Sequence, residues 1–180
     1  GAWELTPSEL ASGSDRIAWA ARSWEADGII NVQGDEPLIE PAMVERLARH
    51  LAERPEDPML TLACPAEPEA LADPNTVKVV VGLSGHALYF SRAGIPYPRQ
   101  PGGATPLAHV GIYGYRRRTL LRLAALPPSP LERRESLEQL RALEHGIPIR
   151  VLLGDAAPPG VDTAADLARV EEILAGAADS

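Results

Sequence analysis

The sequence feature that most constrains the fold is an apolar run that stops abruptly at a glycine, two carboxylates and a proline. Residues 28–32 are mainly β-branched and open with glycine, which is typical of a short buried strand. Gly34 allows a sharp backbone turn, and Pro37 prevents the strand from continuing. Asp35 and Glu36 are therefore expected just beyond the carboxyl end of a strand, where open α/β sheets bind their ligands.

Asp35 is the strongest candidate for a functional carboxylate. Its oxygens suit Mg²⁺, which binds through one or two carboxylates together with substrate phosphates. An aspartate that only caps its own turn is the alternative, but an acidic pair followed by proline exceeds what a turn requires. Asp162 is the second candidate, because Thr163 can cap the helix that follows it. The residues alone favour the alternative for Asp162, a carboxylate that rests against the helix dipole.

Length and charge limit the classes of partner. The chain has 180 residues, enough for one domain with a substantial core, and its net charge of −8 argues against binding to nucleic acid or an anionic membrane. We expect no membrane helix and no secretory leader. The single cysteine, Cys64, is expected to be a small buried hydrophobe, and the four histidines lack metal-ligand spacing. A reducing cytoplasm fits this composition. The chain begins at Gly1 without an initiator methionine, as a processed or truncated product would.

Hydrophobic periodicity and turn residues predict alternating helices and strands. We expect helices that start near residues 12–15 and at Pro41, helices over 116–126 and 131–145, and a last helix after 162–166. Strands are expected over residues 28–33, 59–64, 76–81, 86–90, 109–115 and 147–153, with the third and fourth joined as a hairpin and a loop over 94–106. The last helix is expected to bury Leu167, Val170, Ile173 and Leu174, and Gly111 and Gly114 to allow close approach of a backbone or ligand.

Further polar residues have two interpretations each. In the expected helix over 131–145, Glu138 and Gln139 could face a polar cavity, or belong to a solvated acidic face. Arg92 and His109 each lie at the end of an expected strand. Either could clamp a carboxylate or phosphate, or be a surface charge, and the sequence alone does not decide.

Seven segments, in the same order along the whole chain, resemble the 3-deoxy-manno-octulosonate cytidylyltransferases, also called CMP-Kdo synthetases. They are residues 12–16, 31–39, 75–81, 88–96, 109–116, 129–141 and 160–163. The resemblance implies an α/β fold like that of the nucleotide-diphosphosugar transferases, with a mixed sheet flanked by helices. It also implies one domain over residues 1–180, in which 75–116 serve dimerisation and sugar binding.

The implied reaction joins CTP and 3-deoxy-D-manno-octulosonate (Kdo) to give CMP-Kdo and pyrophosphate, for lipopolysaccharide biosynthesis in the cytoplasm. The implied partners are these two small molecules and a second copy of the chain. By the same resemblance, Asp35 and Asp162 are catalytic and hold Mg²⁺. The resemblance places three residues near the cytidine: Ser12, Gly13 and Arg16. It assigns six residues to the sugar acid: Gln33, Arg92, His109, Tyr113, Glu138 and Gln139.

The sequence departs from the family pattern in two places. Leu10 stands where the family usually has a histidine, two residues before the Ser-Gly pair. The family also opens with a strand and a basic glycine-rich loop that grips the triphosphate, and this chain begins beyond that N-terminal βαβ portion. Two alternatives therefore stand beside the cytidylyltransferase. One is a truncated, non-catalytic module that binds a sugar acid or dimerises, and the other is a cytidylyltransferase for another nonulosonic acid.

Overall fold

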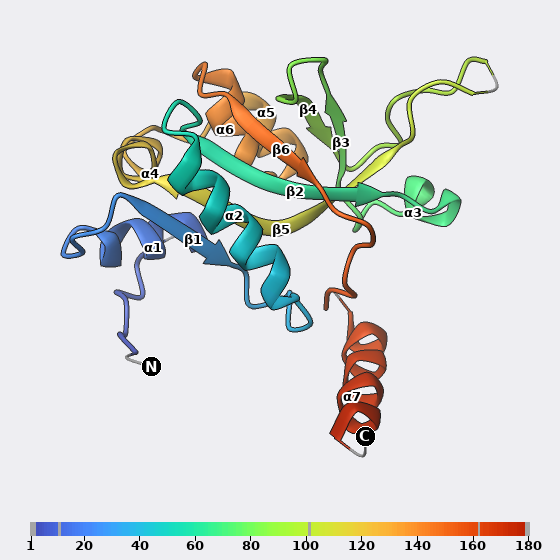
Figure 1. Ribbon diagram of the computed structural model, residues 1–180, viewed down its shortest axis with the longest axis horizontal. Coiled ribbons are helices and arrows are strands. Elements are labelled where there is room, and N and C mark those ends of the chain that lie inside the picture. The colour runs from blue at the N-terminus through green and yellow to red at the C-terminus, as the bar shows by residue number, and fades with distance from the viewer. Residues whose placement is uncertain (1–2, 11, 101, 162, 179–180) are drawn as a thin grey trace.

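The computed structural model describes residues 3–178 apart from residues 11, 101 and 162. Within them, six strands form one mixed sheet in the order β4–β3–β5–β2–β6, with β1 also paired to β5 (Figure 1). β2 and β6 are parallel, and the other pairs are antiparallel. The strands are β1 (Gly28–Val32), β2 (Met59–Pro65), β3 (Lys78–Val81), β4 (Ala87–Ser91), β5 (Leu107–Arg116) and β6 (Ile149–Leu153). The expected mixed sheet is confirmed.

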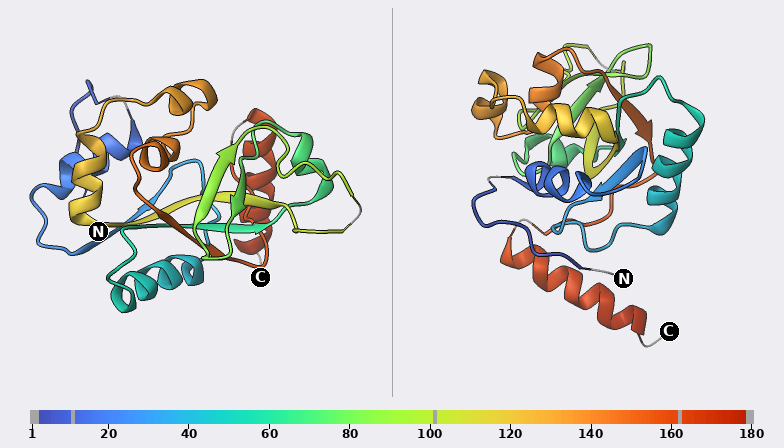
Figure 2. Two further views of the ribbon diagram at one scale, coloured as in Figure 1. Left: turned by 90° about the horizontal axis from the view of Figure 1, so that it is seen from above. Right: turned by 90° about the vertical axis from the view of Figure 1, so that its left-hand side faces the viewer.

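Helices cover both faces of the sheet (Figure 2). α2 (Pro41–Glu53) lies on one face, and four helices lie on the other: α1 (Gly13–Ala21), α4 (Arg117–Ala124), α5 (Pro130–Glu135) and α6 (Gln139–Glu144). A short helix that the sequence did not predict, α3 (Pro68–Ala72), follows β2. α7 (Ala164–Ala178) extends away from the sheet (Figure 1).

The two-residue period of the strands divides the side chains between two cores. Leu60 and Leu62 of β2 pack in one cluster with Leu47 and Leu51 of α2. Met59 belongs to the larger cluster on the opposite face, which also contains side chains of α1, α4 and α6. Each core side chain of this length stabilises the fold by about 1.5–3 kcal/mol relative to exposure.

Local signals in the sequence explain where several helices begin. The Ser12 hydroxyl accepts a hydrogen bond from the Asp15 N–H at 3.1 Å and so caps α1. Pro41 is the first residue of α2, as predicted. At α7 the Thr163 hydroxyl accepts from the Asp166 N–H at 3.2 Å, and an Asp166 carboxylate oxygen accepts from the Thr163 N–H at 2.9 Å. The predicted capping box is therefore confirmed.

The prediction of one helix over residues 131–145 is wrong. The chain breaks into α5 and α6 at Ser136, whose backbone is left-handed with φ 55° and ψ 48°. The Leu137 N–H then bonds to the Glu132 carbonyl at 3.2 Å, which closes the end of α5. Glu135 and Glu138 consequently do not share one helix face. Gly146, with φ 69°, follows α6 and ends it, a position where glycine adopts the left-handed backbone without steric cost.

The expected buried stripe on the last helix is also wrong. Val170 is 3% exposed, but Leu167, Ile173 and Leu174 are 42–50% exposed, because α7 lies away from the sheet (Figure 1). Cys64, by contrast, is fully buried, as predicted. In the part of the chain that the structure describes, no helix is long and apolar enough to cross a membrane.

Candidate functional site

The site lies where the sheet forks at one edge of β5. β1 pairs with residues 112–116 of β5, and β3 pairs with residues 107–108 along the same edge. β2 pairs with the opposite edge. Residues 109–111 therefore lie between two diverging strands, and the acidic loop that follows β1 enters this gap. The fork thus brings the end of β1 against the middle of β5.

The loop after β1 is held against Gly111. Gln33 N–H donates to the Gly111 carbonyl at 3.4 Å, and Gly111 N–H donates to Glu36 Oε1 at 2.8 Å. A Cβ on residue 111 would lie 2.7 Å from Glu36 Oε1 and 2.8 Å from Gln33 Oε1. The close approach at Gly111 is made by these two side chains, and not by a backbone or ligand as predicted. Asp35 is exposed beside it, and its carbonyl accepts a hydrogen bond from Val161 N–H at 2.8 Å.

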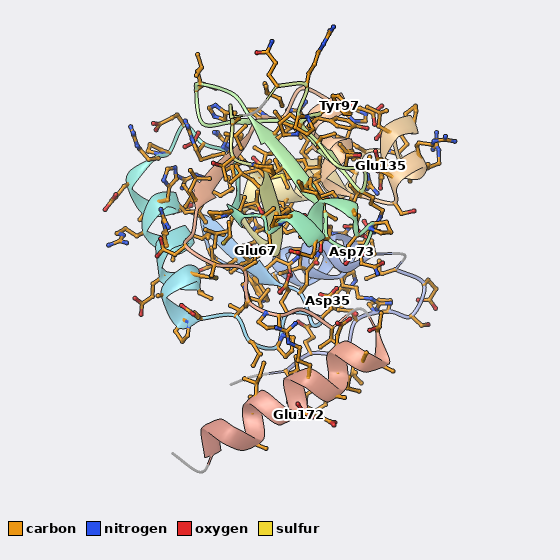
Figure 3. The ribbon with its side chains drawn as sticks, turned by 90° about the vertical axis from the view of Figure 1, so that its right-hand side faces the viewer. Asp35, Glu67, Asp73, Tyr97, Glu135 and Glu172 are labelled. Atoms are coloured by element: carbon orange, nitrogen blue, oxygen red, sulfur yellow. The ribbon has the colours of Figure 1, made fainter. Side chains whose placement is uncertain are left out.

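A pocket of about 340 Å³ lies at the fork, and its lining includes side chains of β5, α4 and α6. Its lining contains seven of the residues that the resemblance assigned to the metal or sugar acid: Gln33, Asp35, Arg92, His109, Tyr113, Glu138 and Gln139. These residues come from β5, from the start of α6 and from the connections that follow β1 and β4 and precede α6. In Figure 3, Asp35 lies between the strands above it and α7 below. The fold therefore collects residues spread over more than 100 positions into one cavity.

Aromatic rings form one wall of the pocket. The His109 ring packs edge-on against Phe90 and at an angle against Tyr113, each with centroids 5.3 Å apart, and Tyr113 stacks on Tyr115 at 5.9 Å. Burial lowers the pKa of His109 to about 3, so the ring is neutral at physiological pH. A neutral ring acts on a ligand through hydrogen bonds rather than through charge. A hydrogen-bonding role is left for it.

Negative charge gathers in this pocket. Burial raises the pKa of Tyr113, and the neighbouring Tyr115, Glu138, Glu36 and Asp35 raise it further. Three carboxylates thus act on one point of the lining, where they repel phosphate and sugar-acid anions. To offset this repulsion, an anionic substrate would need a bound cation at this site in addition to the positive charge of Arg92.

Both the backbone and the side chain of Arg92 donate hydrogen bonds that fix its position. Its N–H donates to Glu135 Oε2, its Nε to the Glu135 carbonyl, and one terminal nitrogen to the Pro74 carbonyl, each at 2.9 Å. Its other terminal nitrogen has no partner among the described residues and is available for an anion. Burial raises the pKa of Glu135, but hydrogen bonds from Arg92, Ser91 and Tyr89 outweigh burial, so its pKa is below its usual value. Glu135 is therefore a charged support for Arg92.

Lys78 holds the backbone of Arg92 in place from inside the protein. Its side chain is fully buried, and Nζ donates to the carbonyls of Asp73 at 2.8 Å, Thr76 at 2.6 Å and Arg92 at 2.6 Å. These bonds join the segment before β3 to the end of β4. Neither Lys78 nor Glu135 was predicted from the sequence as a site residue. The signal available was a lysine inside the apolar strand β3, where a buried ammonium needs several acceptors.

The three residues assigned to the cytidine lie outside this lining. The Ser12 hydroxyl is occupied as the cap of α1, and Gly13 begins that helix. The Arg16 guanidinium donates to Thr6 Oγ1 at 2.8 Å and to the carbonyls of Pro7 and Leu10, each at 3.0 Å. Ser12 instead lines a neighbouring pocket of about 810 Å³, which shares three lining residues with the first: Ser136, Leu137 and Glu138.

The donor chemistry of the pocket fits a hard cation held jointly with a substrate. Asp162 lies outside the described residues, and within those residues no three His, Cys, Asp or Glu side chains gather as a metal site. The Asp35 carboxylate makes no hydrogen bond to another described residue and lines the pocket. Mg²⁺ binds in this manner, through one or two carboxylates completed by substrate phosphates and water.

Comparisons with known proteins show the family of the chain. A family model described as Cytidylyltransferase matches residues 3–149. The 3-deoxy-manno-octulosonate cytidylyltransferase of Chloroherpeton thalassium is 49% identical over 175 residues, which cover 95% of this chain and 71% of the relative. That of Syntrophotalea carbinolica is 47% identical over 186 residues, which cover 98% of this chain and 74% of the relative.

Solved structures share the fold. CMP:2-keto-3-deoxy-manno-octonic acid synthetase complexed with CTP matches with a TM-score of 0.88 at 46% identity, over 93% of this chain and 70% of that chain. HddC from Yersinia pseudotuberculosis matches with a TM-score of 0.64 at 12% identity, over 93% of this chain and 64% of that chain, which shows a common fold alone.

Proposed function

The chain belongs to the cytidylyltransferase family of the CMP-Kdo synthetases, and on this premise we propose that it couples CTP to Kdo with Mg²⁺, releasing CMP-Kdo and pyrophosphate. The observation that supports the sugar acid and the cation is the pocket shared by Asp35, Arg92, Tyr113 and Gln139, and the likeness to a synthetase complexed with CTP supports the nucleotide. The proposal includes a cytoplasmic location, where CTP is made, and a role in supplying activated Kdo for lipopolysaccharide.

In the proposed reaction, the anomeric hydroxyl oxygen of Kdo attacks the α-phosphorus of CTP. A new P–O bond forms, the bond from the α-phosphorus to the bridging oxygen breaks, pyrophosphate leaves in line, and the hydroxyl proton passes to solvent. Phosphoryl transfer of this kind depends on positioning and charge stabilisation rather than on covalent catalysis. The residues of this chain therefore have to orient two anions in one acid-rich pocket.

Arg92 suits the Kdo carboxylate. Its Nε and one terminal nitrogen are held by main-chain carbonyls, which orient the remaining terminal nitrogen without cost at the moment of binding. Gln139 is 5% exposed and begins α6 at the pocket, where its amide can both donate to and accept from sugar hydroxyls. Glu138 and Gln33 line the same pocket and can accept from and donate to the sugar, respectively.

Asp35 and Asp162 are the proposed ligands of Mg²⁺. The assignment of Asp162 rests on the sequence, and Val161 beside it bonds to the Asp35 carbonyl. Bound there with CTP, Mg²⁺ would neutralise phosphate charge and lower the pKa of the attacking hydroxyl. Asp35 and Asp162 would hold the cation, and so reduce the repulsion between the triphosphate and the carboxylates of the pocket.

Asp35→Asn tests the metal assignment. Pyrophosphate release is measured with CTP, Kdo and Mg²⁺, with and without a chelator. We expect wild-type turnover to be lost with the chelator, and Asp35→Asn to lose at least about 100-fold in kcat, since a ligand to the charge-neutralising cation is removed. Asp27→Asn is the matched control, because Asp27 is exposed at the opposite end of β1. Unchanged turnover by Asp35→Asn would contradict the assignment.

A binding measurement separates the enzyme from a non-catalytic module. Calorimetric binding of Kdo without any turnover by this chain would favour a sugar-acid-binding module over the enzyme. Faster turnover of another nonulosonic acid than of Kdo would favour the other cytidylyltransferase.

We also propose that residues 75–116 serve both sugar binding and dimerisation. They contain Arg92, His109 and Tyr113 of the pocket, and a projecting loop whose Tyr97 is 84% exposed (Figure 3). Light scattering should give the mass of a dimer, and a monomer mass at all concentrations would contradict dimerisation.

A further inference from the structure

An isolated hydroxyl lies beneath the pocket at an irregularity of the sheet. Thr61 is fully buried in β2, among the apolar residues Met59, Leu60 and Leu62. The pairing of β2 with β5 changes beside it: Thr61 lies opposite Tyr113, but the next residue, Leu62, lies opposite Val110. Residues 111–112 of β5 therefore have no partner on β2. A buried hydroxyl at such a break satisfies main-chain groups that the ladder leaves unpaired.

The hydrogen bonds of Thr61 determine which nitrogen of His109 carries a proton. Thr61 Oγ1 lies 2.9 Å from the Ile112 carbonyl, 3.4 Å from the Val110 carbonyl and 2.9 Å from His109 Nε2. Carbonyl oxygens only accept, and a hydroxyl has one hydrogen to donate. If Thr61 donates to the Ile112 carbonyl, it must accept from His109. All these groups are satisfied together only when Nε2 carries the proton.

The other ring nitrogen then has a lone pair directed away from Thr61. His109 Nδ1 has no hydrogen-bond partner among the described residues. It is not sealed in the core either, because the one fully buried side-chain nitrogen or oxygen without a partner in the described chain is Arg116 Nε. His109 lines the pocket, so Nδ1 is reached from there. The neutral ring, whose pKa burial lowers to about 3, keeps Nδ1 unprotonated.

We propose that Thr61 is a positioning residue, which holds His109 in the Nε2–H tautomer and so presents Nδ1 to the pocket as a hydrogen-bond acceptor. The group that this acceptor recognises is a hydroxyl of the sugar acid, because a carboxylate or phosphate has no proton to donate at neutral pH. This inference rests on the proposed function for the identity of the sugar. In this proposal, Arg92 binds the carboxylate of the sugar acid and His109 binds one of its hydroxyls.

The tautomer is measured without any turnover. A long-range ¹H–¹⁵N correlation spectrum of the labelled chain reports the protonation of both ring nitrogens of His109, assigned by comparison with His109→Gln. We expect a protonated Nε2 and an unprotonated Nδ1 in the free wild-type chain at neutral pH. A protonated Nδ1, or a mixture of the two tautomers, would overturn the role of Thr61.

Two substitutions separate positioning from structural support. Thr61→Val keeps the branched shape but removes the acceptor, so we expect a mixture of tautomers and a rise of roughly tenfold in KM for Kdo, with KM for CTP unchanged. Thr61→Ser keeps the hydroxyl and should restore both the single tautomer and KM. Equal loss of affinity for both substrates, or the same defect in Thr61→Ser, would overturn the proposal. If Thr61→Val does not fold, the tautomer of His109 is still measured in wild type and in Thr61→Ser. A protonated Nδ1 in either one would overturn the proposal.

Addition of Kdo tests the recognised group. We expect the Nδ1 resonance of wild type to shift toward the value of a hydrogen-bonded acceptor, and 4- or 5-deoxy analogues that lack the contacted hydroxyl to leave it unmoved. An unmoved resonance during Kdo binding seen by calorimetry would overturn the hydroxyl contact. Absence of any Kdo binding would overturn the proposed function with it, while the spectrum of the free chain would still decide the role of Thr61.

Discussion

Gly111 is the residue at which the acidic loop approaches the sheet most closely. Its N–H bonds to Glu36, its carbonyl accepts from Gln33, and both side chains stand where a Cβ would be. Because residue 111 has no side chain, the loop that carries Asp35 can lie close to β5, although the two residues are 76 positions apart in the sequence. A Cβ at residue 111 would push both side-chain ends aside and so disturb the hydrogen bond from the Gly111 N–H to Glu36.

Gly111→Ala should therefore displace the side chains of Gln33 and Glu36 and weaken the hydrogen bond between the Gly111 N–H and Glu36. We expect a loss of about 1–3 kcal/mol in the free energy of unfolding, as for overpacking in general. We also expect turnover to fall, because the displaced side chains belong to the loop that carries Asp35. Gly34→Ala is the matched control in the same loop, because a Cβ there meets no atom within 4 Å, and it should change stability by less than about 0.5 kcal/mol. Urea unfolding measures both variants. Equal stability of the two would contradict the steric explanation.

At the scale of elements, the break between α5 and α6 shapes the rim of the pocket. Ser136 adopts a left-handed backbone, and the chain then turns so that Glu138 precedes α6 and Gln139 begins it. Glu135, at the end of α5, points instead toward β4, where it bonds to Ser91 and Arg92. In one continuous helix, Glu135, Glu138 and Gln139 would all lie on the same helix. Because of the break, Glu135 supports Arg92, whereas Glu138 and Gln139 line the pocket.

Substitution at Ser136 tests this backbone conformation. Ser136→Gly should raise the free energy of unfolding by about 1 kcal/mol, because glycine adopts positive φ without the steric cost of a Cβ. Ser136→Val should lower it by a similar amount or more, because a β-branched residue is more strongly disfavoured there. Thermal unfolding of both variants measures the difference. Destabilisation by glycine would show that the residue is not left-handed in solution.

At the scale of the whole molecule, a buried carboxylate joins four parts of the chain. Asp57, 2% exposed, lies before β2 and bonds to His50 of α2 at 2.7 Å, to His86 of the β3–β4 turn at 3.2 Å and to Arg150 of β6 at 3.1 Å. Burial raises the pKa of Asp57, but the hydrogen bonds from these three partners outweigh burial and hold it below 3.8. The cluster ties α2 and the hairpin to the sheet outside the pocket lining.

The depressed pKa of Asp57 makes stability depend on pH in the acid range. The ionised group contributes its full stabilisation above the unfolded-state pKa of about 3.8, and this contribution is lost as the pH falls through the folded-state value. Asp57→Asn should lose about 1–3 kcal/mol at neutral pH and show a shallower loss of stability in acid than wild type. Urea unfolding across this range checks both effects.

Glu56→Gln is the control for the pH series. Glu56 is the next residue in the chain and pairs with Arg54 at 3.3 Å, but both side chains are about 60% exposed. An exposed pair contributes little, so this variant should follow the wild-type curve. A parallel change in both variants would indicate a general effect of charge rather than the buried cluster.

The sequence by itself determined which segments become strands and helices, and where most of them begin. Apolar periodicity, glycine and proline act within a few residues, so the strand over residues 28–32, the helix from Pro41 and the cap at Thr163 could all be predicted. Recurring motifs also indicated the family, and with it seven residues that line one pocket.

Only the tertiary structure decided how those residues work together. Thr61 and His109 lie 48 positions apart, and Lys78 reaches the carbonyl of Arg92 across a hairpin. The neutral state of His109 follows from burial by its neighbours in space, not in sequence. The break at Ser136 and the exposure of α7 likewise depend on where the chain can pack. Local patterns do not encode these features, because burial and long-range hydrogen bonds arise only when distant segments meet.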